Sequence, residues 1–76
     1  MRRILAIIQE PEVARLIEVN LTRHGYAVNK AYTVAEAQEI LKVAKPDLIV
    51  LDRRLEESAS LLLRDAAAVD IAVKVI

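Results

Sequence analysis

The fold is decided by the stretch Lys45-Pro46-Asp47-Leu48-Ile49-Val50-Leu51-Asp52. Its apolar residues 48–51 follow the turn signal Pro46-Asp47 and include β-branched side chains, which predicts a strand buried on both faces of a sheet. The stretch closes on a carboxylate. Because open α/β sheets place their chemistry at the carboxyl ends of the strands, Asp52 is the first candidate for a functional residue.

Two more strands are predicted upstream. Residues 4–8 form an apolar run of strand length, and residues 26–31 form a more polar run that is typical of an edge strand. A helix is predicted between them. It is expected to begin at Pro11, because proline is favoured at the first helical position, and to end before Gly25, which suits a left-handed helix end.

A second helix is predicted before the central stretch, because Thr33 and Glu36 have the spacing of a capping box. It is expected to bury Ala37, Ile40 and Leu41. Strands that alternate with short helices predict right-handed crossovers and a parallel sheet.

A third helix is predicted downstream, containing the three leucines 61–63 and capped by Ser58 or Ser60. The last run, residues 71–76, is apolar apart from Lys74 and predicts a fourth strand.

The composition restricts the class of protein. A chain of 76 residues suffices for one domain, which is marginal if it stands alone. Its hydrophobic content of 55% excludes disorder, and the lack of cysteine excludes disulfides and thiolate metal sites. Eleven basic residues balance eleven acidic ones, which does not favour nucleic acid or an anionic membrane as a partner. No apolar run approaches the ~20 residues of a membrane span, so a soluble, cytoplasmic protein is expected.

Taken together, the motifs resemble the receiver domain of bacterial response regulators in two-component signalling. The resemblance rests on Ile4-Leu5-Ala6-Ile7 before Glu10-Pro11-Glu12-Val13, on Leu21–Tyr26, on Ala31–Leu41 and on the strand that ends at Asp52. It implies a flavodoxin-like α/β fold with strand order 2-1-3-4, truncated after the fourth strand of five, with residues 1–76 as a single domain. It also implies that Asp52 stands where receiver domains are phosphorylated.

The chain departs from the receiver pattern at the metal site. The family places two acidic residues after the first strand, where they help to hold Mg²⁺, but here Ile8 and Gln9 stand in those positions and only Glu10 remains. An alkyl group and a neutral amide do not supply the oxygens and charge that Mg²⁺ prefers. We therefore expect Mg²⁺ binding, and phosphorylation that depends on it, to be lost, with no other cofactor implied.

The second departure is at the end of the chain. The family's switch hydroxyl and its late lysine have no counterpart before Ile76, and Leu55-Glu56-Glu57 replaces the usual Pro-Asp loop. A sheet that ends at the fourth strand exposes an apolar edge, which invites pairing with a second chain. The candidate interface residues are Ile71, Val73, Val75 and Ile76.

The sequence therefore predicts a degenerate receiver-like domain that acts by association, with homodimerisation the simplest form, and is not an enzyme. The alternative is a phosphoacceptor fragment of a response regulator, with Asp52 as the site and a histidine kinase or another signalling protein as partner. A phosphate-binding module is disfavoured, because Gly25 is the one glycine and no glycine-rich loop exists.

Several charged residues near the site have plain structural interpretations. Asp52 is expected to pair with Arg53 or Arg54 or to be solvated, and the two arginines are expected in solvent or paired with Glu56 and Glu57. Glu10 is expected to interact with the amino terminus of the first helix. His24 is expected at the end of that helix rather than as a ligand.

Overall fold

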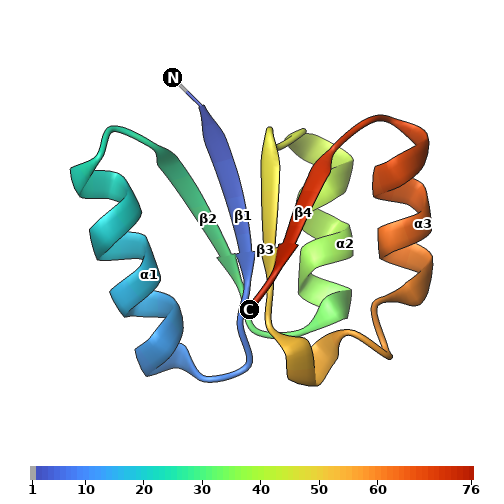
Figure 1. The fold of residues 1–76 in the computed structure, drawn as a ribbon, viewed down its shortest axis with the longest axis horizontal. Coiled ribbons are helices and arrows are strands. Elements are labelled where there is room, and N and C mark those ends of the chain that lie inside the picture. Colours follow the sequence, from blue (N-terminus) through green and yellow to red (C-terminus); the bar gives the residue numbers. More distant parts are fainter. Residues whose placement is uncertain (1) are drawn as a thin grey trace.

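The computed structural model describes residues 2–76 as a parallel four-stranded sheet with helices on both faces (Figure 1). The elements follow in the order β1 (Arg3–Ile7), α1 (Pro11–Arg23), β2 (Ala27–Ala31), α2 (Val34–Val43), β3 (Leu48–Leu51), the 3₁₀ helix η1 (Arg53–Leu55), α3 (Ser60–Ala68) and β4 (Ala72–Val75). The strand order in space is β2-β1-β3-β4. This confirms the predicted fold class, the alternation of elements and the strand order.

The predicted helix signals for α1 and α2 are confirmed. α1 begins at Pro11, and Gly25 follows its end with a φ of 91°, in the left-handed region. At the start of α2, the Thr33 hydroxyl accepts a hydrogen bond from the Glu36 N–H at 3.1 Å, and the Glu36 carboxylate accepts one from the Thr33 N–H at 3.1 Å. These reciprocal bonds satisfy backbone donors that the first turn leaves without partners.

The predicted cap of α3 is wrong. Ala59 is the N-cap residue and makes no side-chain capping bond, while the Ser58 hydroxyl donates to the Leu55 carbonyl at 3.0 Å. The segment between η1 and α3 is itself turned, so its backbone N–H groups donate to carbonyls of the preceding turn. The Ala59 N–H, for example, donates to the Leu55 carbonyl at 3.0 Å.

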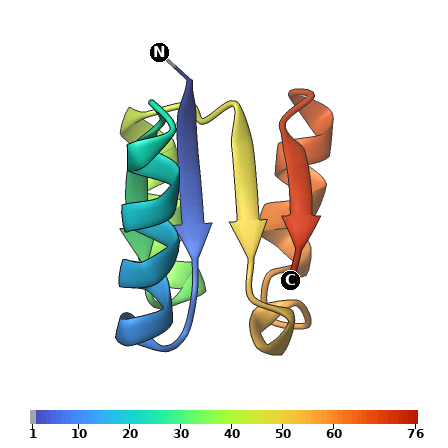
Figure 2. The ribbon, with the colours of Figure 1, turned by 60° about the vertical axis from the view of Figure 1, so that its left-hand side comes forward.

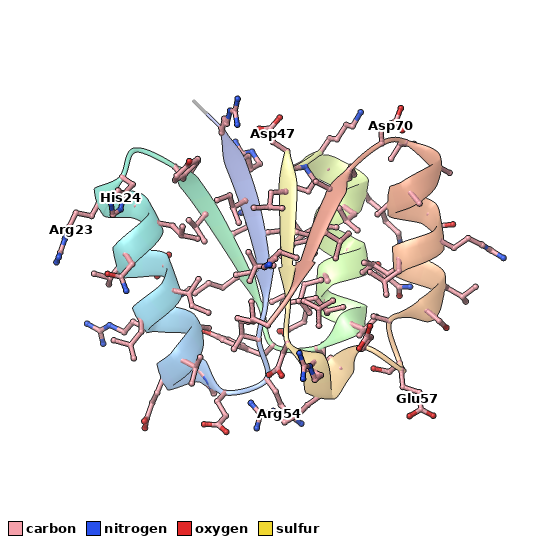
Figure 3. The ribbon with its side chains drawn as sticks, in the orientation of Figure 1. Arg23, His24, Asp47, Arg54, Glu57 and Asp70 are labelled. Atoms are coloured by element: carbon pink, nitrogen blue, oxygen red, sulfur yellow. The ribbon has the colours of Figure 1, made fainter. Side chains whose placement is uncertain are left out.

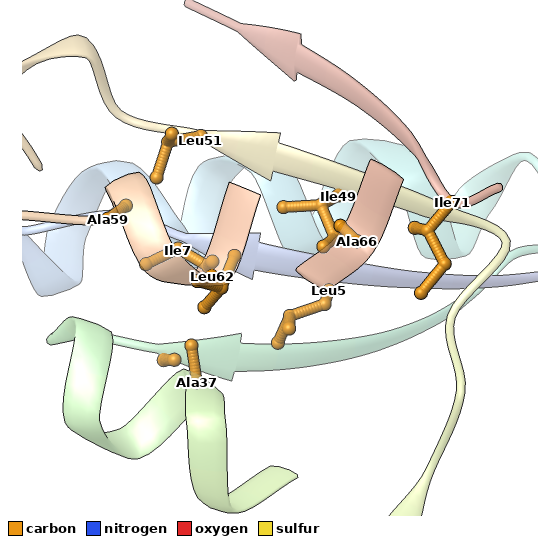
Figure 4. Close-up of a cluster of buried hydrophobic side chains, with 10 residues drawn as sticks. Leu5, Ile7, Ala37, Ile49, Leu51, Ala59, Leu62, Ala66 and Ile71 are labelled. Atoms are coloured by element: carbon orange, nitrogen blue, oxygen red, sulfur yellow. The ribbon is translucent and has the colours of Figure 1, made fainter. Parts of the chain in front are cut away.

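The larger core lies between the sheet and the helices α2 and α3 (Figure 4). Alternate residues of the inner strands point to this face. Its buried residues are Leu5, Ile7, Ala31, Ala37, Ile49, Leu51, Ala59, Leu62, Ala66 and Ile71. Of the predicted core residues of α2, Ala37 is buried, and Ile40 and Leu41 pack against the cluster while partly buried.

The opposite face is covered by α1 alone within residues 2–76, and α1 lies over β1 and β2 (Figure 2). The core on this side is small, with Ala6, Ile8 and Ala14 buried. Val50 of β3 packs partly buried against this core, and within residues 2–76 no helix lies over β4 or the rest of β3 on this face. We call this surface the open face; by the alternation of side chains it consists of Leu48, Val50, Ala72, Lys74 and Ile76.

β4 is an edge strand within the described residues, as predicted. One candidate interface residue must be withdrawn, because Ile71 precedes the strand and is buried in the larger core. Val73 and Val75 pack partly buried against that core, and Ile76 is 50% exposed. No helix of residues 2–76 is long and apolar enough to cross a membrane.

Candidate functional site

The candidate site lies at the carboxyl end of the central strands. β1 and β3 are neighbours in the sheet, so the residues that follow them meet at one edge. The Asp52 N–H donates to the Ile7 carbonyl at 2.8 Å, and the Arg53 N–H donates to the Ile76 carbonyl at 3.0 Å. The turn after β3 is thereby fixed between its two neighbouring strands, and Figure 3 shows Arg54 at this end, opposite Asp47 and Asp70.

Asp52 is buried, with 6% of its surface exposed, and both of its carboxylate oxygens are hydrogen-bonded. Oδ1 accepts from the Arg54 backbone N–H at 3.0 Å and from its Nε at 3.2 Å. Oδ2 accepts from a guanidinium nitrogen of Arg54 at 2.9 Å and from the Gln9 backbone N–H at 3.1 Å. The carboxylate thus caps η1 and receives a bidentate guanidinium at the same time.

Arg54 joins this carboxylate to a second one. Its other terminal nitrogen donates to the Glu10 carboxylate at 2.8 Å. This corrects two expectations: Glu10 is the N-cap residue of α1 but makes no side-chain capping bond, and Arg54 pairs with Asp52 and Glu10 rather than with Glu56 or Glu57. The pair of Arg54 with Glu10 could not be predicted from local sequence, because 44 residues separate the two.

The charges at the site stabilise one another. The hydrogen bonds from the Arg54 side chain lower the pKa of Asp52 from 3.8 to about 2, despite the burial that opposes this shift. The hydrogen bonds to Asp52 and then to Glu10 raise the pKa of the Arg54 guanidinium above its already high value. At neutral pH Asp52 and Arg54 are therefore both charged and form a paired anion and cation.

The residues present do not fit a receiver-type Mg²⁺ site. Ile8 is buried against Ala6 and Ala14 on the α1 side of the sheet, and Gln9 is exposed and contributes its backbone N–H to Asp52. No group of three or more His, Cys, Asp or Glu side chains that suits a metal occurs among residues 2–76. Mg²⁺ is held by oxygen ligands, whereas a guanidinium occupies the carboxylates here.

The remaining polar candidates lie apart from the site. His24 caps the end of α1, with its Nδ1 at 2.8 Å from the Asn20 carbonyl, as its structural interpretation predicted. Asp47, at the amino end of β3, accepts a hydrogen bond from the Arg3 N–H at 2.8 Å. No sequence motif indicated this second link between β3 and β1.

Sequence comparison finds related response regulators. The transcriptional regulatory protein KdpE of Mycobacterium tuberculosis is 34% identical over 61 residues, or 80% of this chain and 27% of KdpE. The regulatory protein VanR of Enterococcus faecium is 37% identical over 59 residues, or 78% of this chain and 26% of VanR. The alkaline phosphatase synthesis regulator PhoP of Bacillus subtilis is 41% identical over 51 residues, or 67% of this chain and 21% of PhoP.

Solved structures match the whole chain. The receiver domain of HemR from Leptospira biflexa, in its non-phosphorylated form, superimposes with a TM-score of 0.82 at 24% identity, over 99% of this chain and 63% of that one. This chain has the receiver fold, and its sequence relatives are response regulators. The response regulator TrrA of Thermotoga maritima, solved with Mg²⁺ and BeF, superimposes with a TM-score of 0.69 at 23% identity, over 99% of this chain and 66% of TrrA.

The match to the receiver fold has two limits. The chain spans between 21% and 27% of the length of KdpE, VanR and PhoP. No protein-family model matches it. The fold is that of a receiver domain, and the sequence relatives are response regulators.

Proposed function

We propose that this chain is a receiver-type signalling module that acts through protein association, first of all with a second copy of itself, and that it is neither an enzyme nor competent for Mg²⁺-dependent phosphorylation. The module is proposed to work in the cytoplasm without nucleic acid or membrane as a partner. The observation that carries the proposal is that, within residues 2–76, β4 is an edge strand and no helix covers the sheet face beside it.

The free hydrogen-bonding groups of β4 support the association. The Ile76 N–H donates to the Leu51 carbonyl at 2.9 Å, and the Ile76 carbonyl accepts from the Arg53 N–H, so both backbone groups of Ile76 point toward β3. Alternate residues of a parallel strand bond to the same neighbour, so the N–H and carbonyl groups of Val73 and Val75 point out of the edge. Two such edges related by a two-fold axis pair as antiparallel strands and extend the sheet.

The composition of the same region supports this proposal. β4 carries one charge, Lys74, and no proline, and edge strands that avoid pairing usually carry several such features. The neighbouring open face contributes the half-buried Leu48 and Val50 and the half-exposed Ile76. Burial of these groups in a dimer would add apolar contact to a chain of 76 residues, whose own core is small.

Sedimentation equilibrium of the 76-residue chain tests self-association. We expect a dimer at micromolar concentration and a thermal midpoint that rises with protein concentration, because association and folding are coupled. The substitution Val75→Pro removes an N–H that points out of the edge and should yield monomer.

Ala72→Lys places a charge on the open face and tests face-to-face packing of two sheets in the same way. Val43→Lys is the matched control, because Val43 is exposed at the end of α2 on the other side of the sheet. A folded monomer with a midpoint independent of concentration would contradict the homodimer.

A second candidate function has one observation in its favour. Asp52 stands at the carboxyl end of β3 in a receiver fold, where a phosphoacceptor is expected. On this interpretation a histidine kinase or another signalling protein would be the partner. Incubation with acetyl phosphate and Mg²⁺, followed by intact mass measurement, separates the two candidates. Our proposal predicts no adduct, and a stoichiometric adduct that is lost in Asp52→Asn would establish the alternative.

A further inference from the structure

We propose that the Arg54 guanidinium is the permanent cation of this site and that it keeps divalent metal ions away from the carboxylates of Asp52 and Glu10. The inference rests on the receiver fold and on the part of the proposed function that excludes Mg²⁺-dependent phosphorylation. It adds the residue responsible and the way in which it acts.

The guanidinium lies between the two carboxylates. It contacts both oxygens of Asp52, at 3.2 Å through Nε and at 2.9 Å through a terminal nitrogen, and it contacts Glu10 at 2.8 Å through the other terminal nitrogen. Three of its donor groups are therefore directed at the two acidic side chains that face this edge. A planar fork of donors suits this bridging better than an ammonium would.

A divalent ion would have to displace this arrangement. The Asp52 oxygens already accept four hydrogen bonds, two of them from backbone N–H groups that hold the side chain in place. An ion beside Asp52 and Glu10 would also be repelled by the charge on Arg54 at short range. The neutral Gln9 and the buried Ile8 supply no charge that offsets this repulsion.

The bridge also has a mechanical role, because it joins two loops. Glu10 and Gln9 belong to the β1–α1 loop, and Asp52 and Arg54 belong to the turn after β3. A metal ion at this edge would connect the same two segments only while it is bound. Arg54 connects them through its hydrogen bonds to Asp52 and Glu10, and because its guanidinium belongs to the chain, this connection needs no bound ligand.

The test compares Arg54→Gln with the matched control Arg53→Gln, which also removes one positive charge but from a residue outside the bridge. Mn²⁺ is the probe, and paramagnetic broadening of the Gln9 amide signal reports its binding. We expect Arg54→Gln to bind Mn²⁺ at least about tenfold more tightly than the wild type or Arg53→Gln. Hydrogen exchange at the Gln9 N–H should also become faster in Arg54→Gln alone.

Equal Mn²⁺ affinity in folded Arg54→Gln and Arg53→Gln would overturn the inference. If Arg54→Gln does not fold, the wild type still decides: site-specific broadening of the Gln9 amide by millimolar Mn²⁺ would overturn it, and no such effect would support it. Arg54→Lys keeps the charge and should exclude the ion almost as well. These outcomes do not depend on oligomeric state, so a failure of the dimer proposal in sedimentation is distinguishable from a failure here.

Discussion

The two faces of the sheet differ in how much of each is covered by helices. On one face α2 and α3 cover a core of ten buried residues. On the other, α1 covers three, and within residues 2–76 no helix covers β4. The polar site at the carboxyl edge of the sheet is also internally satisfied, because every buried side-chain nitrogen and oxygen of residues 2–76 has a hydrogen-bond partner. The difference indicates which surfaces can contact another chain. The acidic site has its hydrogen-bond partners within the molecule, whereas in the described part of the chain the β4 edge has unpaired backbone groups and the open face has uncovered apolar side chains.

The largest effect is expected from damage to the covered face. Leu62 is buried in the larger core, and Leu62→Ala should lower the free energy of unfolding by about 2–5 kcal/mol. The free energy of unfolding of a chain of this length is expected to be about 4–11 kcal/mol, so Leu62→Ala should remove a large share of it. Leu61→Ala is the control, because Leu61 is 57% exposed on the same helix and should change stability by about 0.5 kcal/mol or less. Urea denaturation measures both, and equal effects would contradict the assigned core.

The α1 face should tolerate a charge poorly even though it is the smaller core. Ile8 is buried against Ala6 and Ala14, so Ile8→Asp, which restores an acidic residue of the receiver pattern, should cost about 3 kcal/mol. Gln9→Asp lies on the surface and should cost about 0.5 kcal/mol or less. Thermal denaturation of the two single variants checks this. A fully stable Ile8→Asp would contradict the burial of Ile8 under α1.

Acid should weaken the internally satisfied site by a smaller amount. The pKa of Asp52 is about 2 in the folded chain and 3.8 ordinarily, so its contribution is present above the ordinary value and is lost as the pH falls toward about 2. Because the Arg54 side chain is 53% exposed, solvent screening limits this contribution to about 1 kcal/mol.

The measurement is urea denaturation of the wild type and of Asp52→Asn at neutral pH and at a pH near 2. The difference in the free energy of unfolding should be present at neutral pH and shrink on acidification. A difference that stays constant across this range would mean that the Arg54 contact does not depend on the Asp52 charge.

Substitutions in the turns away from both faces should change stability by about 1 kcal/mol or less. Gly25 has a φ of 91° with no atom within 4 Å of an added Cβ, so Gly25→Ala should cost about 1 kcal/mol from backbone strain alone. Asp70 has a φ of 60°, and Asp70→Gly should change stability by about 0.5 kcal/mol or less, since glycine removes strain but adds freedom to the unfolded chain. Thermal melts of these variants provide the baseline for the other predictions.

Much of the fold was predictable because its signals are local. Pro11 and Gly25 mark the ends of α1, and the Thr33–Glu36 capping box marks the start of α2 through contacts within one turn. The cap of α3 was mispredicted for the same reason, since the neighbouring serines suggested a cap while η1 supplied carbonyl partners. Asp70 in the left-handed region was missed as well, because aspartate there is tolerated rather than required.

The site was predictable only in part. The position of Asp52 after a buried strand identifies the carboxylate, and its pairing with a neighbouring arginine is confirmed for Arg54. The involvement of Glu10 was not predictable, because parallel pairing of β1 with β3 brings together residues that are far apart in the sequence. No periodicity or motif in the sequence indicates whether Arg53 or Arg54 contacts the Glu10 carboxylate.

The sequence alone determined the elements, their order and the parallel sheet, since hydrophobic runs and helix ends are set by neighbouring residues. The tertiary structure decided which charged groups pair with one another and which apolar groups are buried. It directed Arg54 to two carboxylates, buried Ile8 and Ile71, and left Val73 and Val75 with outward backbone groups. The physical reason is that ion pairing and burial depend on distances across the sheet, which are fixed only after the strands have paired.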